Sequence, residues 1–274
     1  MTTGTDIINR FEKFCDPDLA ESWDHVGLQI GDPDRPVKRL MTTLDVRPET
    51  VDEAIEKDVD FIFAHHPVMF KPARDLDLRN PQNAMYAKIL AHGITVYAAH
   101  TNLDTVNGGM NDWLANQLQL SNTVPLVDHD LDPKTGIPRG MGRIGQLPRA
   151  MTVDKFAQYC LQVFQIPGER LIVDPAHHKT IRRVAVLGGS GGSFYQAAVD
   201  KKADAYVTGD VSYHTAHDMK AAGLAVVDAG HHIESVAIHG LSQLLNQWKQ
   251  QHDWSVEILE TAVNTEPFQF VTKK

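Results

Sequence analysis

The sequence predicts an α/β protein in which helices cover mainly parallel sheets. Strand-like apolar runs alternate with helical patterns along most of the 274 residues, which is typical of parallel sheets. Histidine and carboxylate side chains follow several of these runs, and open α/β sheets bind their ligands at the carboxyl ends of strands. The chain is long enough for one large domain or two small ones, with 42% hydrophobic and 22% charged residues.

The first part of the chain contains three strand–helix alternations. Short apolar runs at residues 40–44, 61–64 and 94–99 predict buried strands. Helical patterns follow at residues 48–55, 84–91 and 109–120. Pro48 opens the first of these helices, where its missing N–H group has no helical partner to lose.

Residues 122–148 differ in character from the flanking segments. Prolines and glycines interrupt any regular period there: Pro125, Pro133, Gly136, Pro138, Gly140, Gly142, Gly145 and Pro148. We therefore predict a domain junction in this segment.

A second alternating block follows the proposed junction. We expect a helix at residues 152–164 and strands at residues 183–187, 205–208 and 224–227, with helices between them. A final amphipathic helix is predicted at residues 235–249, because its apolar residues recur near helical spacing.

Composition excludes several classes of function. A net charge of -9 and a pI near 5.8 argue against a nucleic-acid binder, which carries a basic face. The two cysteines, Cys15 and Cys160, form no CxxC motif, so neither a disulfide framework nor a thiolate zinc site is supported. No apolar run approaches membrane-spanning length, and the first residues do not resemble a signal peptide. We therefore expect a cytoplasmic protein that does not associate with a membrane.

Histidines and carboxylates at the predicted strand ends indicate a metal site. His65 and His66 end the run at residues 61–64, and adjacent side chains on extended backbone point apart, so each is better suited to its own ion. Asp104 follows the next strand, while His231 and Glu234 are three residues apart and share a helical face. Imidazole and carboxylate without thiolate suit zinc, iron or manganese.

Other polar residues leave alternatives open. A lone histidine at a strand end is more often a satisfied polar residue than a ligand, so His100 and His232 fit supporting and structural roles equally well. Asp210 and His214 either cap a helix or face a cleft. Residues 188–193 are glycine-rich and suit an anion cradle or, more simply, a tight turn. We interpret His177 and His178 as solvated surface.

Five motifs, taken in order, resemble the NIF-three-like family, whose members are named GTP cyclohydrolase 1 type 2 homologues. They are Trp23-Asp24-His25-Val26-Gly27-Leu28, His65-His66-Pro67, His100-Thr101-Asn102-Leu103-Asp104, Thr208-Gly209-Asp210 with His214, and Gly230-His231-His232-Ile233-Glu234. The resemblance covers nearly the whole chain. It implies that two divalent metal ions are bound by His65, His66, Asp104, His231 and Glu234. Many members place the glutamate four residues after the histidine rather than three, which keeps the same helical face.

The resemblance also implies a fold and an activity. The fold is two interleaved α/β halves, with residues 1–124 and 229–274 in the metal-binding domain and residues 125–228 in the second domain. The implied assembly is a ring-shaped homohexamer. The implied activity is a metal-dependent hydrolase acting on a small molecule, a nucleotide such as GTP, whose imidazole ring is opened with release of formate. His100 or His214 would carry protons.

Two alternatives stay open for the same residues. A two-metal centre also suits a phosphoesterase or nucleotidase, with a metal on each of the attacking and leaving oxygens. A ring-shaped protein that binds metal or a partner without catalysis is the other.

Overall fold

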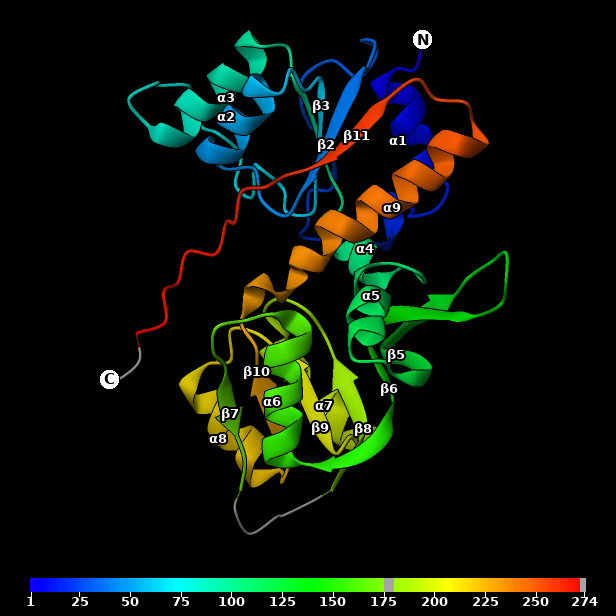
Figure 1. The fold of residues 1–274 in the computed structure, drawn as a ribbon, viewed down its shortest axis with the longest axis vertical. Coiled ribbons are helices and arrows are strands. Elements are labelled where there is room, and N and C mark those ends of the chain that lie inside the picture. Colours follow the sequence, from blue (N-terminus) through cyan, green and yellow to red (C-terminus); the bar gives the residue numbers. More distant parts are fainter. Residues whose placement is uncertain (175–179, 272–274) are drawn as a thin grey trace. The chain divides into compact units, whose positions relative to one another are not determined.

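The structure is a computed structural model, and it describes residues 1–174 and 180–271. The chain forms two units (Figure 1). Unit 1 contains Met1–Val106 and Ala237–Thr265, and unit 2 contains Asn107–Val236 together with the residues from Glu266 onward. The chain therefore leaves unit 1, builds most of unit 2 and returns, which confirms the expected fold of two interleaved α/β halves.

Unit 1 is built on a five-stranded sheet with the order β1-β4-β3-β2-β11. Three of its pairings are parallel, and only the edge strand β1 runs antiparallel to its neighbour β4. The strands are β1 (Gly27–Ile30), β2 (Arg39–Thr43), β3 (Phe61–Ala64), β4 (Thr95–Ala98) and β11 (Glu257–Glu260). β2, β3 and β4 consequently end at the same edge of the sheet.

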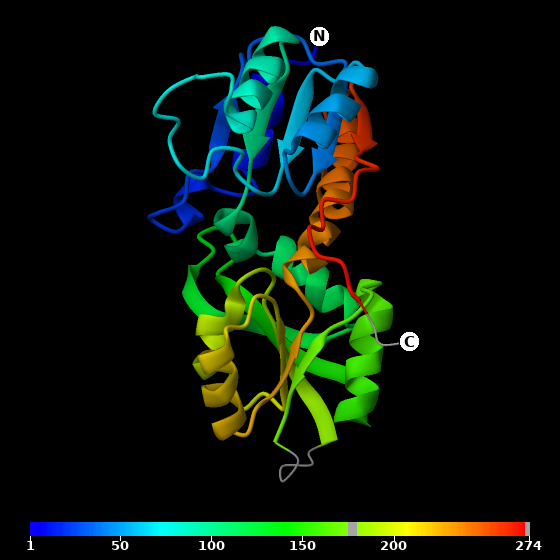
Figure 2. The same cartoon turned by 90° about the vertical axis from the view of Figure 1, so that its left-hand side faces the viewer.

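Helices cover both faces of this sheet (Figures 1 and 2). The helices of unit 1 are α1 (Gly4–Glu12), η1 (Pro17–Leu19), α2 (Pro48–Glu56), α3 (Pro81–Ala91), α4 (Thr101–Thr105) and α9 (Val236–Gln251). Successive side chains along β3 point to opposite faces of the sheet. Ile62 points to the face that α2 and α3 cover, because it belongs to the same core cluster as their buried residues. Phe63 points to the other face, where its ring lies 4.8 Å from that of Phe11 in α1. Trp248 of α9 packs against Phe11 at 6.2 Å, so α1 and α9 cover this second face.

Unit 2 contains a six-stranded mixed sheet with the order β5-β6-β8-β9-β10-β7. Its centre, β8-β9-β10, is parallel, and the remaining pairings are antiparallel. The strands are β5 (Ser121–Leu131), β6 (Pro138–Thr152), β7 (Arg170–Ile172), β8 (Thr180–Val186), β9 (Ala205–Thr208) and β10 (Ala225–Asp228). The helices are α5 (Met110–Gln117), α6 (Val153–Phe164), η2 (Gly191–Phe194), α7 (Tyr195–Asp200), α8 (Tyr213–Ala221) and η3 (His231–Ser235).

The segment at residues 122–148 is not the irregular junction that its prolines and glycines suggested. β5 and β6 form a long antiparallel hairpin there, at one edge of the sheet. Pro125 is tolerated because β5 is an edge strand, and Pro138 because it is the first residue of β6. Gly140 lets the two strands approach: a Cβ atom at this position would lie 2.0 Å from the carbonyl oxygen of Val127.

The limits of the units differ from the boundaries expected after residues 124 and 228. Residues 107–124 fold with unit 2, because α5 packs on β6 and β8. η3 also contacts α5, so residues 229–236 remain in unit 2 and the chain returns to unit 1 at Ala237. In the parts of the chain that the structure describes, no helix is long and apolar enough to cross a membrane.

Candidate metal centre

Unit 1 gathers three histidines at the carboxyl edge of its sheet. His65 and His66 directly follow β3, and His100 comes two residues after β4. Parallel pairing sets Ala64 opposite Ala98, which brings these chain segments side by side. Each of the three histidines offers a ring nitrogen within 4.8 Å of the other two, a spacing at which one metal ion can be shared. Asp104 joins them from α4, with its Oδ1 atom 3.8 Å from Nε2 of His65.

Hydrogen bonds fix the orientation of the two adjacent imidazoles. His65 Nδ1 donates to the backbone carbonyl of Ala99 at 2.8 Å, and a carbonyl oxygen can only accept. His66 Nδ1 lies 2.7 Å from Oδ1 of Asp45, which directly follows Leu44 beyond β2. With the proton on Nδ1, each ring keeps the lone pair of Nε2 for a metal ion. The two rings remain neighbours, with their centroids 5.0 Å apart.

Asp24 plays the same part for His100. Its Oδ2 atom accepts from His100 Nδ1 at 2.9 Å and from the Thr101 hydroxyl at 2.6 Å and amide at 3.0 Å. Burial opposes ionisation of Asp24, but the hydrogen bonds and charge of His100 and the bonds from Thr101 outweigh it and lower the pKa of Asp24 to about 2. The carboxylate therefore stays charged, and the His100 ring is held with Nε2 available.

Unit 2 contributes His231 and Glu234, both in η3. His231 Nε2 lies 3.1 Å from Oε2 of Glu234, so the two can present donors to one ion. His231 Nδ1 lies 2.8 Å from Oδ2 of Asp210, which also accepts a 2.7 Å bond from the Ser190 hydroxyl. Burial opposes ionisation of Asp210, yet these two hydrogen bonds outweigh it and hold the pKa of Asp210 below its ordinary value. The imidazole is thus oriented as His65 and His66 are.

The glycine-rich loop at residues 188–193 makes room for Glu234. A Cβ atom on Gly188 would lie 2.8 Å from both Cγ and Oε1 of Glu234. A Cβ atom on Gly189 would lie 2.7 Å from Oε1, and Gly189 also has a φ of +60°, which favours glycine. The loop that sequence analysis considered as an anion cradle or a tight turn therefore packs directly against a candidate ligand.

Two further predictions concern histidines outside these clusters. His214 is exposed on α8, and its ring packs edge-on against Tyr213 at 5.5 Å. The predicted surface pair His177 and His178 lies outside the described residues.

Sequence analysis assigned no role to two of the carboxylates that orient the histidines. Asp45 follows a predicted strand just as Asp104 does, so the strand-end rule offered a signal for it. Asp24 lies in a loop before β1 and does not follow a predicted strand. Its only signal in the sequence was its place in the motif at residues 23–28.

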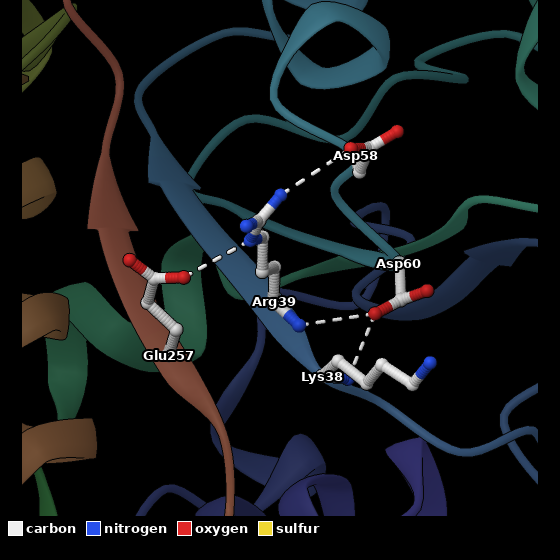
Figure 3. A pocket seen from close by; sticks show the side chains of 5 residues that line it. All are labelled: Lys38, Arg39, Asp58, Asp60 and Glu257. Carbon is white, nitrogen blue, oxygen red and sulfur yellow. Dashed lines mark hydrogen bonds and ion pairs between the residues drawn. The ribbon is translucent and has the colours of Figure 1, made fainter.

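A pocket at the opposite edge of the unit 1 sheet has a different character (Figure 3). It lies where β2, β3 and β11 begin, and its charges pair with one another. The Arg39 guanidinium bonds Glu257 at 3.0 Å and Asp58 at 3.4 Å, while Asp60 accepts from the backbone amides of Lys38 and Arg39. These contacts tie strand ends together, and the pocket has no imidazole to offer a metal.

The donor set is compatible with a transition-metal ion. Imidazole nitrogens and carboxylate oxygens are gathered in both units, and the Nδ1 atoms of the ligand histidines already have acceptors. Outer hydrogen bonds of this kind set the tautomer and raise the basicity of metal-binding histidines. The described residues thus include His, Asp and Glu groups that can hold a metal ion.

A family model, curated relatives and a solved structure each match nearly the whole chain. The model of the Duf34/NIF3 (NGG1p interacting factor 3) family matches residues 2–267. The GTP cyclohydrolase 1 type 2 homolog of Streptococcus pneumoniae is 42% identical over 97% of this chain and 99% of its own length. Its namesake from Lactococcus lactis is 36% identical over 96% of this chain and 98% of its own. The crystal structure of a Bacillus cereus protein related to NIF3 superposes with a TM-score of 0.93 at 29% identity, covering 98% of this chain and 99% of that one.

Proposed function

Because the chain belongs to the Duf34/NIF3 family, we propose that it is a metal-dependent hydrolase that opens the imidazole ring of GTP and releases formate. The observation that carries the proposal is that His65, His66 and His231 have the same hydrogen-bonding arrangement. Each has its Nδ1 atom on an oxygen acceptor and keeps Nε2 for a metal ion. In addition, a carboxylate lies beside Nε2 in two of them, Asp104 at 3.8 Å from His65 and Glu234 at 3.1 Å from His231.

We further propose that the ligands of both units serve one dinuclear centre. Five protein ligands suit two ions that keep open positions, whereas His231 and Glu234 alone are too few for a catalytic site. The path of the chain supports the proposal. Asp104 lies two residues before Val106, where the chain leaves unit 1, and Glu234 lies two residues before Val236, where it leaves unit 2. The donor types favour zinc, iron or manganese.

The ion would supply Lewis acidity and a nucleophile from water at neutral pH. The chain's own groups then divide the remaining tasks. Two carboxylates, Asp104 and Glu234, offset half of the charge of two divalent ions, which leaves positive charge for a phosphate-bearing substrate. His100 presents Nε2 beside the candidate ligands while Asp24 accepts a hydrogen bond from its Nδ1, so the geometry places it to carry a proton. His214 is exposed on α8, and we do not include it.

The test is turnover by the full-length, metal-loaded protein. Loss of GTP with equal release of formate, followed by chromatography, is the expected result. Hydrolysis of simple phosphoesters or other nucleotides without formate would instead support a two-metal phosphoesterase or nucleotidase. Full metal occupancy without turnover of GTP, a nucleotide panel or phosphoesters would support a metal- or partner-binding protein and contradict the hydrolase.

We also propose that the protein forms a ring-shaped homohexamer and works in the reducing cytoplasm. The proposal follows from the resemblance noted above, and burial of both Cys15 and Cys160 suits a chain that relies on no disulfide. Light scattering of the metal-loaded protein should give six times the mass of the chain. A monomer at micromolar concentration would rule the ring out.

A further inference from the structure

We propose that Trp23 and Phe70 form a stacking site for the planar heteroaromatic ring of the substrate. The inference rests on the proposed function, because the metal centre would hold the other end of the same molecule. It adds the residues that recognise the ring.

Trp23 and Phe70 are large aromatic side chains that remain open to solvent. They are 56% and 55% exposed although they stack on each other, with ring centroids 6.2 Å apart and planes inclined by 30°. Trp23 precedes β1 and Phe70 follows β3, so two separate loops bring them together. Exposed apolar surface of this kind, next to polar groups, marks ligand-binding positions.

His100 connects this aromatic pair to the candidate ligands. Its ring meets Trp23 at 6.0 Å and Phe70 at 5.6 Å, edge-on in both cases. The same ring lies 5.2 Å from His65 and 5.5 Å from His66. One imidazole therefore separates the aromatic pair from the metal-binding histidines. The aromatic pair and the candidate ligands are thus neighbours of the same imidazole, close enough for one nucleotide-sized molecule to contact both.

The chemistry of the pair defines the class of ligand. Aromatic side chains accept any planar base, and each stack contributes about 1–3 kcal/mol by alanine substitution. Lys71 and Arg74 follow Phe70 on the same exposed loop and offer positive charge in a chain whose net charge is -9. Together these features suit a heteroaromatic ring carried on a phosphorylated group, as in a nucleotide. A sugar phosphate without a heteroaromatic base would use only part of the site.

The experiment compares guanosine monophosphate with ribose 5-phosphate on the metal-loaded full-length protein. Both carry one phosphate on ribose, and only the first has a heteroaromatic base. We expect the nucleotide to bind about 5- to 150-fold more tightly by calorimetry, which is the stacking free energy expressed as an affinity ratio. We also expect it to quench the fluorescence of Trp23.

Variants separate stacking from other effects. Trp23→Ala and Phe70→Ala should lower nucleotide affinity toward that of ribose 5-phosphate while sugar phosphate affinity and metal content stay unchanged. Trp23→Phe should retain the ring preference, because it keeps an aromatic face. Phe268→Ala removes another aromatic side chain, 70% exposed and outside this cluster, and should change nothing.

Several outcomes would overturn the inference. Equal affinity of the wild type for the two ligands is one, and unchanged nucleotide affinity in both alanine variants is another. A change of molecular mass in those variants, with nucleotide affinity intact, would show that the pair contacts another copy of the chain. Binding is measured without turnover. Ring-dependent binding with no hydrolysis would therefore support the stacking site and contradict the hydrolase, and hydrolysis without ring preference would do the reverse.

Discussion

The candidate ligands of unit 1 and unit 2 rest on different kinds of structure. His65 and His66 directly follow a buried strand, and their side chains are 0% and 16% exposed. His231 lies in a short 3-10 helix, its side chain is 38% exposed, and Asp210 holds it from a loop. Asp210 itself has a φ of 52°, an uncommon conformation for a residue other than glycine. The same donor chemistry therefore follows a buried strand in one unit and lies on a short 3-10 helix in the other, where the His231 side chain is more exposed.

The largest expected effect comes from the unit 1 carboxylate. Asp104→Ala removes charge that would offset the bound cations, so we expect metal affinity to fall about 100-fold or more and hydrolase activity to disappear. Metal content by mass spectrometry and a thermal melt would be measured together. His239→Ala is the control, because His239 also bonds a carboxylate, Glu260 at 2.9 Å, but is exposed. Wild-type metal content in Asp104→Ala would refute the site.

The next prediction compares the orienting carboxylates directly. Asp45→Ala and Asp210→Ala each remove the Nδ1 partner of a ligand histidine, a change that typically costs 10- to 100-fold in metal affinity. We expect about tenfold for Asp45, because the His66 side chain is only 16% exposed, and about 100-fold for Asp210, because the His231 side chain is 38% exposed and has more room to turn. Metal titration of both variants tests this. Equal losses, or the reverse order, would contradict the difference drawn between the units.

A smaller effect is expected where the loop makes room for the ligand. Gly188→Ala would push against Cγ and Oε1 of Glu234 and against Cδ1 of Leu114, so we expect Glu234 to shift and metal affinity to fall about 2- to 10-fold. Gly192→Ala is the matched control, since a Cβ atom there meets its neighbours at 3.7 Å or more. Equal metal affinities of the two variants, by the same titration, would show that the loop does not set the position of Glu234.

The smallest predicted effect concerns a carboxyl of unit 2 apart from these ligands. Burial raises the pKa of Glu169 to about 7, above its ordinary value of 4.5. Between these values the folded chain keeps a proton that the unfolded chain has lost, so this group makes stability fall as pH rises from about 4.5 to about 7. Glu169→Gln should therefore melt about 2–4 °C above the wild type at pH 8, roughly 1 kcal/mol after allowing for partial exposure. At pH 4.5 the two melting temperatures should agree, and a constant difference at both pH values would argue against this titration.

The α/β class and most of the regular elements could be predicted from local patterns in the sequence. Runs of buried apolar residues predicted β3 and β9 with the bounds that the structure gives, and helical spacing predicted α6 and α9 to within two residues. The sequence also showed which candidate ligands follow strands, namely His65, His66, Asp104 and His231. Their grouping could be expected because a parallel sheet places the ends of its strands at one edge. The positions of strands and helices can be predicted in this way because local periodicity does not depend on which distant segments pack together.

Contacts between distant segments could not be predicted from these local patterns and became visible in the folded chain. The hairpin β5–β6 was missed because its prolines and glycines break local patterns, and they are tolerated only where a strand lies at an edge or two backbones approach closely. β11 is a short strand whose pairing with β2 joins residues some 218 positions apart. Asp24 reaches His100 from a loop 76 residues away, so no spacing in the sequence announces the contact. Such pairings depend on the summed packing of whole elements, which is why strand ends could be located from the sequence while the groups that orient their histidines could not.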